Sequence, residues 1–399
     1  MREKRYTRPS LPHYRFAQVV CGLVAGVVFR RKILRNEIRG KKGPFVVLAN
    51  HQAMLDFVTL IGASARPMSF VISQAFSSSL PIKGYLHKMG VIPKQQFQTS
   101  ANDLKKIKAV VDAGEPLVLY PAGLMCEDGL STPIPSATYK LLKWLKADVY
   151  VAKVKGTYFV MPKWTKGMRP GRTYLDIYKL FSAEELAELP PEEVRRRTDE
   201  ALLFDAYREQ EELRVRYCGN SNVAGLENVL YQCPHCGAEF AMEAQDSHTL
   251  RCVQCGYAQK MDELAFFHNT GHGEELRYVS DWSRLIHDRL KDRILRGEAR
   301  TLSAGTGIHM VDPEKNKFTA VGDGTLSLSE TAFRLEGTIH GRPVTVEVPI
   351  GDLPTLPFSP GRHLELQDGN TIYRCVLTDG RLAMKFIHML KIFHEIKAT

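Results

Sequence analysis

Short apolar runs alternate with helical patterns between residues 44 and 180, and this alternation sets the expected fold class. Runs of β-branched and aromatic residues bounded by turns are typical of strands, and they lie at 44–50, 68–73, 116–121, 148–156 and 173–180. Helical patterns separate them at 54–64, 101–113 and 136–146. Strands that alternate with helices predict an α/β layered domain with a mainly parallel sheet.

Positive charge is concentrated at the start of the chain. Residues 1–100 hold 16 Lys and Arg against 3 Asp and Glu; the whole chain carries +10, so the other 299 residues sum to −3. Such an excess needs an anionic partner or counter-ions. An anionic membrane surface, a phosphorylated substrate and a merely solubilising basic tail all remain open. Nucleic acid ranks last, because no nucleic-acid motif occurs in this third of the chain.

Residues 16–29 ("FAQVVCGLVAGVVF") form an apolar run with basic residues on both sides. The run has 14 residues, whereas crossing a bilayer takes about 20. No small-residue cleavage site follows it, which disfavours a secretion signal. A helix of this kind is suited to lying in a membrane interface, and a buried core helix is the alternative. The interfacial interpretation predicts a cytoplasmic protein, peripheral on the inner face of the membrane.

Three further segments follow the α/β pattern. Residues 182–217 are charged and helical, broken at Pro190–Pro191 because proline interrupts a helix, and they close a first domain at 1–217. Residues 278–300 are expected to form an amphipathic linker helix. From 301 to 399, short alternating strands and a last helical run predict an antiparallel β domain capped by a helix. That domain resembles the pleckstrin-homology or GRAM sort.

Residues 228–270 carry four cysteines in two C-x2-C pairs that fifteen residues separate: Cys233, Cys236, Cys252 and Cys255. This spacing lets two tight turns present four thiolates to one tetrahedral Zn²⁺, and four thiolates close the shell of a structural metal. Two disulfides or a redox pair are the alternatives. Both are poor fits for a chain without a secretion signal, because disulfides persist mainly in oxidising compartments. We expect this zinc ribbon, or the β domain, to bind a protein partner. The net charge of −4 over residues 201–300 disfavours nucleic acid here too.

The stretch "FVVLANHQAMLDF" (45–57) places a histidine and an acid on a strand-to-helix turn. The strand brings His51 to its carboxyl end, where open α/β sheets bind their ligands. Asp56, at the start of the next helix, can hold one ring nitrogen while the other takes a proton. The pair then forms a dyad that deprotonates a hydroxyl. A helix-capping aspartate beside a satisfied histidine is the alternative.

Four blocks, in order, give a more specific resemblance: "NHQAMLD" (50–56), "KGYLHKMGVIPKQQ" (83–96), "PLVLYPAGLMCEDG" (116–129) and "VYVAKVKG" (149–156). Together they resemble the glycerolipid, or lysophosphatidic acid, acyltransferase family over about residues 16–180. The resemblance implies an O-acyltransferase of the 1-acylglycerol-3-phosphate type, active in phospholipid biosynthesis. The donor would be a thioester of coenzyme A or acyl carrier protein, and the acceptor a lysophospholipid-like hydroxyl.

The resemblance also implies roles for particular residues. His51 would be the general base and Asp56 its orienting acid, and the helix start after His51 would supply a donor to the thioester oxygen. The implied substrate-binding residues are Asn50, Lys94, Tyr120, Pro121 and Gly123.

The chain departs from the family pattern where the acceptor is recognised. Ala122 replaces the acid of the third block, and Leu124 and Met125 replace its Thr-Arg. Glu127 or Asp128 could supply a displaced carboxylate.

The arginine expected near Gln95 and Gln96 is absent, so Lys94 alone is left to bind phosphate, without arginine's bidentate fork. A retained dyad with altered recognition favours an enzyme with an unusual acceptor. A catalytically inactive lipid-binding or scaffold protein is the main alternative, and a zinc-ribbon nucleic-acid or protein adaptor is the third hypothesis.

Overall fold

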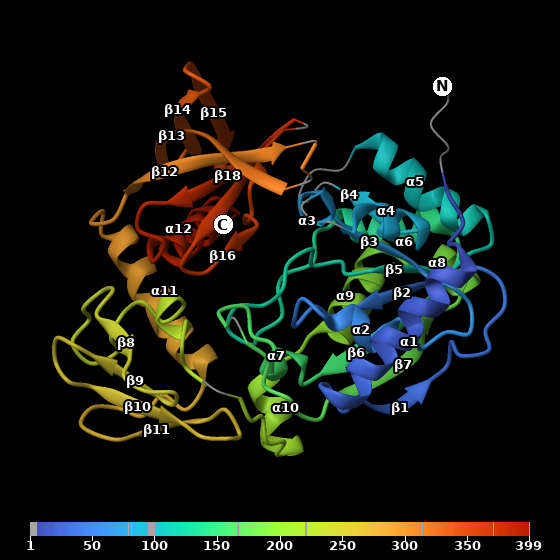
Figure 1. The fold of residues 1–399 in the computed structure, drawn as a ribbon, viewed down its shortest axis with the longest axis horizontal. Coiled ribbons are helices and arrows are strands. Elements are labelled where there is room, and N and C mark those ends of the chain that lie inside the picture. The colour runs from blue at the N-terminus through green and yellow to red at the C-terminus, as the bar shows by residue number, and fades with distance from the viewer. Residues whose placement is uncertain are drawn as a thin grey trace. The chain divides into compact units, whose positions relative to one another are not determined.

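The computed structural model describes residues 6–78, 80, 82–94, 100–165, 167–219, 222–312, 314–315, 317–369 and 371–398. Gln95 and Gln96 lie outside the described residues. The chain folds as two compact units (Figure 1). Unit 1 comprises Met1–Pro162 and Met168–Gly219, and unit 2 comprises Lys163–Gly167 and Asn220–Thr399.

Unit 1 is built on a seven-stranded sheet with the strand order β1-β7-β6-β2-β5-β3-β4. The strands are β1 (Lys32–Asn36), β2 (Phe45–Ala49), β3 (Ser69–Ser73), β4 (Ile92–Lys94), β5 (Leu117–Leu119), β6 (Asp148–Lys155) and β7 (Tyr174–Phe181). All neighbours pair in parallel except β6 and β7, which are antiparallel. The predicted mainly parallel sheet is therefore confirmed, and β1 and β4 are the two strands that the sequence patterns missed.

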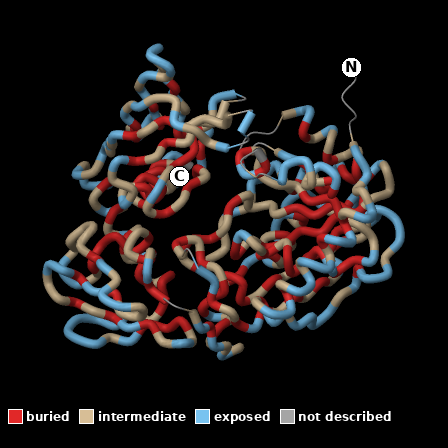
Figure 2. The backbone as a smooth tube through the Cα atoms, in the orientation of Figure 1, coloured by how far each residue is buried: buried red, intermediate tan, exposed pale blue. Residues whose placement is uncertain are grey.

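Helices cover both faces of this sheet. The helices of unit 1 are α1 (Leu11–Val27), α2 (Asp56–Leu60), α3 (Gln74–Ser78), α4 (Lys83–Lys88), α5 (Ala101–Asp112), α6 (Ala137–Leu145), α7 (Thr157–Val160), α8 (Ala183–Glu188), α9 (Pro191–Leu202) and α10 (Ala206–Leu213). Side chains alternate across a strand, so Phe45 and Val47 of β2 pack with α1 and α2, whereas Val46 and Leu48 pack with α5 and α6. Figure 2 shows the strands between these layers as mainly buried.

The helix predicted at 54–64 is shorter than expected, since α2 ends at Leu60. The segment 182–217 is broken at Pro190–Pro191 as predicted, with Pro191 in the first turn of α9. A second break, which the sequence did not indicate, separates α9 from α10. There Asp205 caps α10 by accepting hydrogen bonds from the N–H groups of Tyr207 and Arg208.

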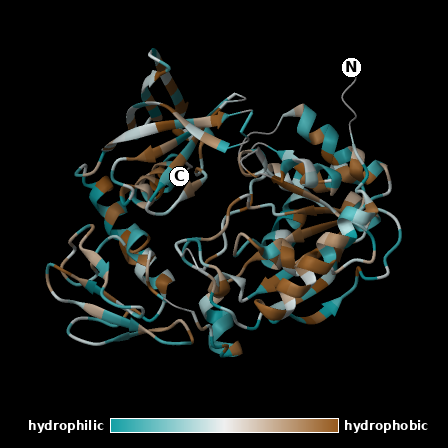
Figure 3. Ribbon diagram, in the orientation of Figure 1, coloured by the Kyte–Doolittle hydropathy of each residue, from teal (hydrophilic) through white to brown (hydrophobic). Residues whose placement is uncertain are grey.

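Helix α1 begins earlier than the predicted 16–29 and has two different faces. Tyr14, Ala17 and Ala25 are buried against the sheet, so part of the core-helix alternative holds. The opposite face leaves five apolar side chains exposed: Phe16, Val19, Val20, Leu23 and Val27. Figure 3 colours most of α1 as hydrophobic. None of the helices in the described ranges has the length and apolar character needed to cross a bilayer.

Unit 2 contains a cysteine-rich sheet, one long helix and a C-terminal β domain. The first sheet has the order β11-β10-β9-β8, formed by β8 (Met242–Ala244), β9 (Thr249–Cys252), β10 (Ala258–Met261) and β11 (Phe267–Asn269) and preceded by a short 3-10 turn, η1 (Leu226–Asn228). Helix α11 (Val279–Leu295) matches the predicted linker helix. Its apolar residues Trp282, Ile286, Leu290 and Ile294 are buried, whereas Leu295, the last residue of the helix, is 64% exposed.

The C-terminal sheet is antiparallel, and helix α12 (Leu382–Ala398) closes the domain, as predicted. Its strands are β12 (Thr301–Asp312), β13 (Lys317–Ser329), β14 (Ala332–Ile339), β15 (Arg342–Pro349), β16 (Phe358–Ser359), β17 (His363–Asp368) and β18 (Thr371–Leu377), with a 3-10 turn, η2 (Ile350–Asp352), between β15 and β16. The first two strands are longer than the short strands that were predicted, since β12 has 12 residues and β13 has 13. Glycines interrupt their alternation, and two of them, Gly322 and Gly324, lie where a Cβ would meet the backbone of β14. The likeness to pleckstrin-homology or GRAM domains stays a prediction.

Candidate active site

The turn after β2 is fixed first by Asn50. Its Nδ2 donates to Val154 O at 2.8 Å, and its Oδ1 accepts from Val154 N at 2.7 Å, so the side chain continues the pairing of β2 with β6. Asn50 is only 4% exposed. Both ends of its amide are taken by Val154, which gives the side chain a role in holding the turn. Its predicted contact with substrate stays a prediction.

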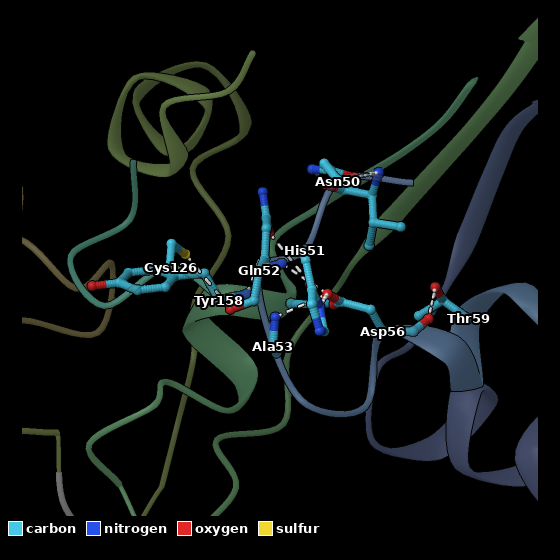
Figure 4. Close-up of polar contacts among 10 residues, drawn as sticks. Asn50, His51, Gln52, Ala53, Asp56, Thr59, Cys126 and Tyr158 are labelled. Atoms are coloured by element: carbon cyan, nitrogen blue, oxygen red, sulfur yellow. Dashed lines mark hydrogen bonds and ion pairs between the residues drawn. The ribbon is translucent and has the colours of Figure 1, made fainter. Parts of the chain in front are cut away.

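His51 and Asp56 form the contact that the spacing predicted. His51 Nδ1 lies 2.9 Å from Asp56 Oδ2 (Figure 4). The Asp56 side chain is fully buried, whereas the His51 side chain keeps 20% of its surface exposed. With Nδ1–H donating to the carboxylate, the lone pair lies on Nε2. The pair therefore has a buried acid behind a partly accessible base, which is the arrangement that general-base chemistry needs.

Asp56 also organises the backbone between the two residues. Its Oδ2 accepts from the N–H groups of Gln52 at 2.7 Å and Ala53 at 2.9 Å. Leu55, not Asp56, holds the N-cap position of α2 and makes no side-chain cap, so the helix-capping alternative is wrong. The N–H groups of Gln52 and Ala53, which precede α2, are therefore already engaged by Asp56. The predicted donor role of the helix start toward a thioester oxygen stays a prediction.

The third block meets the His51 turn through Tyr120 and Cys126. The Tyr120 and His51 rings lie 4.5 Å apart between centroids. Cys126 N donates to His51 O at 3.3 Å, and Cys126 Sγ donates to Gln52 O at 3.6 Å. Burial first, and then the charge of Asp56, raises the pKa of Tyr120 well above its ordinary value. The phenol is thus a neutral donor, and its buried oxygen has no hydrogen-bond partner in the described parts of the chain.

The remaining predicted substrate residues share the carboxyl edge of the sheet. Pro121 and Gly123 follow β5 in a tight turn, where Gly123 has φ +71° and its N–H donates to Tyr120 O at 3.0 Å. Lys94 ends β4, which lies three strands from β2 in the sheet order. Burial lowers the pKa of Lys94, and Asp103 opposes that shift. The structure therefore brings Tyr120 to His51 and leaves Lys94 farther along the same edge.

Residues 30–162 match the acyltransferase family model. The match covers a third of the 399-residue chain and contains the whole His51 turn and the Tyr120 block. The acyltransferase match thus supports, in general terms, the family that the four blocks indicated. It leaves the donor, the acceptor and the roles of single residues as predictions.

The solved structures that match include two weak likenesses. The 1-acyl-sn-glycerophosphate (LPA) acyltransferase PlsC from Thermotoga maritima is 17% identical, with a TM-score of 0.42, over 52% of this chain and 80% of that chain. The Ran binding domain of the nuclear complex component Nup2 from Ashbya gossypii is 11% identical, with a TM-score of 0.19, over 23% of this chain and 94% of that chain. Neither value decides a family. The comparison with curated proteins gave no match.

Sequence reasoning missed two residues that hold the His51 turn. Gln52 is fully buried, and its Oε1 accepts from Thr157 Oγ1 and Tyr158 N, both at 3.3 Å. Cys126, to which the sequence assigns no role, contacts the turn twice. Both Gln52 and Cys126 lie inside the quoted blocks, so their positions could have drawn attention to them. Their partners could not be read from spacing.

The four cysteines of unit 2 form a second site. Their Sγ atoms all lie within 4.8 Å of one another. Cys233 and Cys255 are 3.7 Å apart and Cys236 and Cys252 3.8 Å apart, whereas a disulfide requires about 2.05 Å. Four sulfurs placed tetrahedrally at about 2.3 Å from one zinc ion are about 3.8 Å apart. The donor set and its spacing therefore fit one structural Zn²⁺.

Two glycine turns shape this cluster. Gly237 N donates to Cys233 O and Gly256 N to Cys252 O, each at 3.0 Å. Both glycines have positive φ, +76° and +78°, a conformation that costs glycine little. Each C-x2-C turn therefore presents its two thiols on one side, as the spacing predicted.

Proposed function

We propose that this protein is a membrane-peripheral O-acyltransferase of the 1-acylglycerol-3-phosphate acyltransferase type. It would move a fatty acyl group from a thioester of coenzyme A or acyl carrier protein to a hydroxyl of a lysophospholipid-like acceptor, in phospholipid biosynthesis at the cytoplasmic face of a membrane. The observation that carries the proposal is the 2.9 Å contact between partly exposed His51 and buried Asp56. The acyltransferase match over residues 30–162 supports it.

The dyad would act in two proton steps. Nε2 of His51 takes the proton of the acceptor hydroxyl as its oxygen attacks the thioester carbonyl carbon, and the imidazolium that forms is stabilised by Asp56. When the tetrahedral intermediate collapses, the carbon–sulfur bond breaks and the same proton passes to the leaving thiolate. The products are an ester and a free thiol. Three donors converge on Asp56 Oδ2, which keeps the carboxylate oriented toward the ring in both steps.

The acceptor differs from that of the resembled family because the polar groups of the third block are missing. Ala122 sits on the Tyr120–Gly123 turn and offers no carboxylate. Lys94 ends β4, three strands from β2, which is about 14 Å at the usual strand spacing. A phosphate held by Lys94 would therefore need a side chain extended toward His51. We propose that the acceptor is recognised with fewer charged contacts than a glycerol phosphate usually receives.

The exposed face of α1 supports membrane attachment. Phe16, Val19, Leu23 and Val27 recur at helical spacing and are 64%, 63%, 65% and 72% exposed. Basic residues flank this apolar face, with Arg30 exposed directly after the helix. An apolar face with basic residues beside it is typical of helices that lie in the interface of anionic membranes.

Replacing Leu23 with glutamate is expected to weaken binding to anionic vesicles at least about tenfold, because burying a leucine is worth roughly 1.5–3 kcal/mol. Co-sedimentation with vesicles of phosphatidylglycerol and phosphatidylethanolamine measures the partition coefficient. Leu295→Glu is the matched control, since Leu295 is 64% exposed at the end of α11, whereas its apolar neighbours Leu290 and Ile294 are buried. Equal binding by the Leu23 variant and the unmodified protein would contradict the membrane-bound α1.

The enzymatic proposal is tested by thioester turnover on vesicles. The purified protein is given acyl-CoA or acyl carrier protein thioesters together with lysophospholipids of different head groups. Free thiol and acylated product are measured, the latter by mass spectrometry. We expect equal amounts of thiol and new ester with at least one acceptor, and that acceptor identifies the substrate class. No thiol release with any pair, alongside intact vesicle binding, would instead support the lipid-binding scaffold.

A further inference from the structure

A carboxyl group outside the acyltransferase match lies beside the His51 turn. Glu209 is on α10, beyond residues 30–162. Its side chain is only 12% exposed, and its Oε1 lies 3.9 Å from Lys155 Nζ, which makes a long ion pair. Its Oε2 is buried and makes no hydrogen bond with any described residue. A buried carboxylate oxygen without a hydrogen-bond partner destabilises the folded chain.

Gln52 is the neighbour that links Glu209 to the dyad. Its Oε1 is occupied by Thr157 Oγ1 and Tyr158 N (Figure 4), so the amide orientation is set by two donors. Nε2 then faces away from them, is buried, and makes no full hydrogen bond among the described residues. The Gln52 amide is nevertheless a neighbour of Glu209, since it lowers the pKa of that carboxyl. Gln52 Nε2 and Glu209 Oε2 are thus a buried donor and a buried acceptor, each without a full hydrogen bond among the described residues.

The backbone of Gln52 completes the connection. Its N–H donates to Asp56 Oδ2 at 2.7 Å, the same oxygen that contacts His51 Nδ1. A shift of Gln52 would therefore move the group that holds Asp56, and with it the imidazole.

We infer that Glu209 is a positioning residue for the dyad, which it holds through Gln52, and that its ionisation tightens the His51 turn. This inference rests on the proposed function, because the dyad is its object. The ionised carboxylate accepts the Gln52 Nε2–H, whereas the protonated form offers a weaker acceptor. Glu209 thereby supplies a carboxylate to the turn from α10, where the third block has lost its own at Ala122.

Glu209 ionises in the neutral pH range, where its change of charge can affect an enzyme. Burial raises the pKa of Glu209 to about 7, and Asp205 adds to the rise. The opposing groups that lower it are Lys155 and Lys153 of β6 and the Gln52 amide. Tyr217, whose own pKa Glu209 helps to raise, is the further titratable group nearby. Burial outweighs both lysines, so Glu209 changes charge near neutral pH.

Glu209→Gln tests this inference, because glutamine has the shape of the protonated acid and cannot ionise. We expect the variant to match the unmodified protein in kcat at pH 5.5 and to fall about tenfold below it at pH 8.5. KM for the thioester should stay the same. Glu212→Gln is the matched control on the exposed side of α10 and should change nothing. In a Gln52→Ala background, Glu209→Gln should have no further effect. A rate ratio that is constant across pH would overturn the inference.

Two readouts do not need catalysis. The side-chain amide resonance of selectively ¹⁵N-labelled Gln52 should titrate with a midpoint near pH 7 and lose that transition in Glu209→Gln.

A raised carboxyl pKa means that the stability of the folded chain falls as pH rises from the carboxyl pKa of the unfolded chain to about 7. The variant should therefore melt higher at pH 8, by roughly 5 °C, with a gap that shrinks toward pH 4.5. An unchanged Gln52 titration overturns the positioning role even in an active enzyme, whereas missing thioester turnover overturns only the proposed function.

Discussion

His51→Ala is expected to lower kcat for acyl transfer by about 10³-fold or more, because it removes the only base that the dyad offers and general bases contribute up to about 10⁴-fold. The side chain is 20% exposed and Asp56 keeps its two backbone donors without it, so the turn should persist. Product formation is measured by mass spectrometry with the acceptor found for the unmodified protein. The residual rate then reports what substrate binding alone supplies.

The matched control for this prediction is His87→Ala. His87 is exposed on α4, and among the described residues no hydrogen bond or ion pair joins it to His51 or Asp56, so its removal should leave kcat unchanged. Circular dichroism and vesicle binding should be the same for both variants. Full activity in His51→Ala would remove the dyad from the chemistry. A variant that loses vesicle binding as well would show that the turn, and not only the base, had been damaged.

The part of the site that could be predicted is the part that is local in sequence. His51 and Asp56 lie on one strand-to-helix turn, so their spacing and the expected strand end were enough to bring them together. Tyr120 could be placed nearby because the carboxyl ends of parallel strands share one edge of the sheet. The cysteine turns were predictable for the same reason, since each C-x2-C pair with its glycine closes on itself.

The contacts that hold the dyad in place could not be predicted, because they join segments far apart in the chain. Asn50 pairs with Val154, Gln52 with the start of α7, and Cys126 with the backbone of the turn. No spacing rule relates Glu209 to any of them. Strands β1 and β4 were missed for another reason. They are short edge strands without a clear alternation of apolar and polar residues.

Removing zinc is expected to unfold the cysteine-rich sheet, because structural Zn²⁺ contributes about 10–16 kcal/mol to the folding of small modules. The sheet has strands of only three or four residues, too little for an independent core. Helix α11 should lose support with it. Trp282 Nε1 donates to Gln232 O at 2.9 Å, and Arg289 donates to the carbonyls of Cys233 and Pro234 at 3.2 and 2.6 Å.

Cys236→Ser is the sharpest form of this experiment. Cys236 is an exposed residue, so its substitution costs little packing and a large effect reports the loss of a metal ligand. Cys218→Ser, at another exposed cysteine outside the cluster, is the matched control. We expect one zinc per chain by elemental analysis in the control and none in Cys236→Ser. The fluorescence of Trp282, fully buried beside Tyr257 and Phe267, should shift to the red. Native fluorescence in a zinc-free protein would contradict the structural metal, since the sheet would then be stable without it.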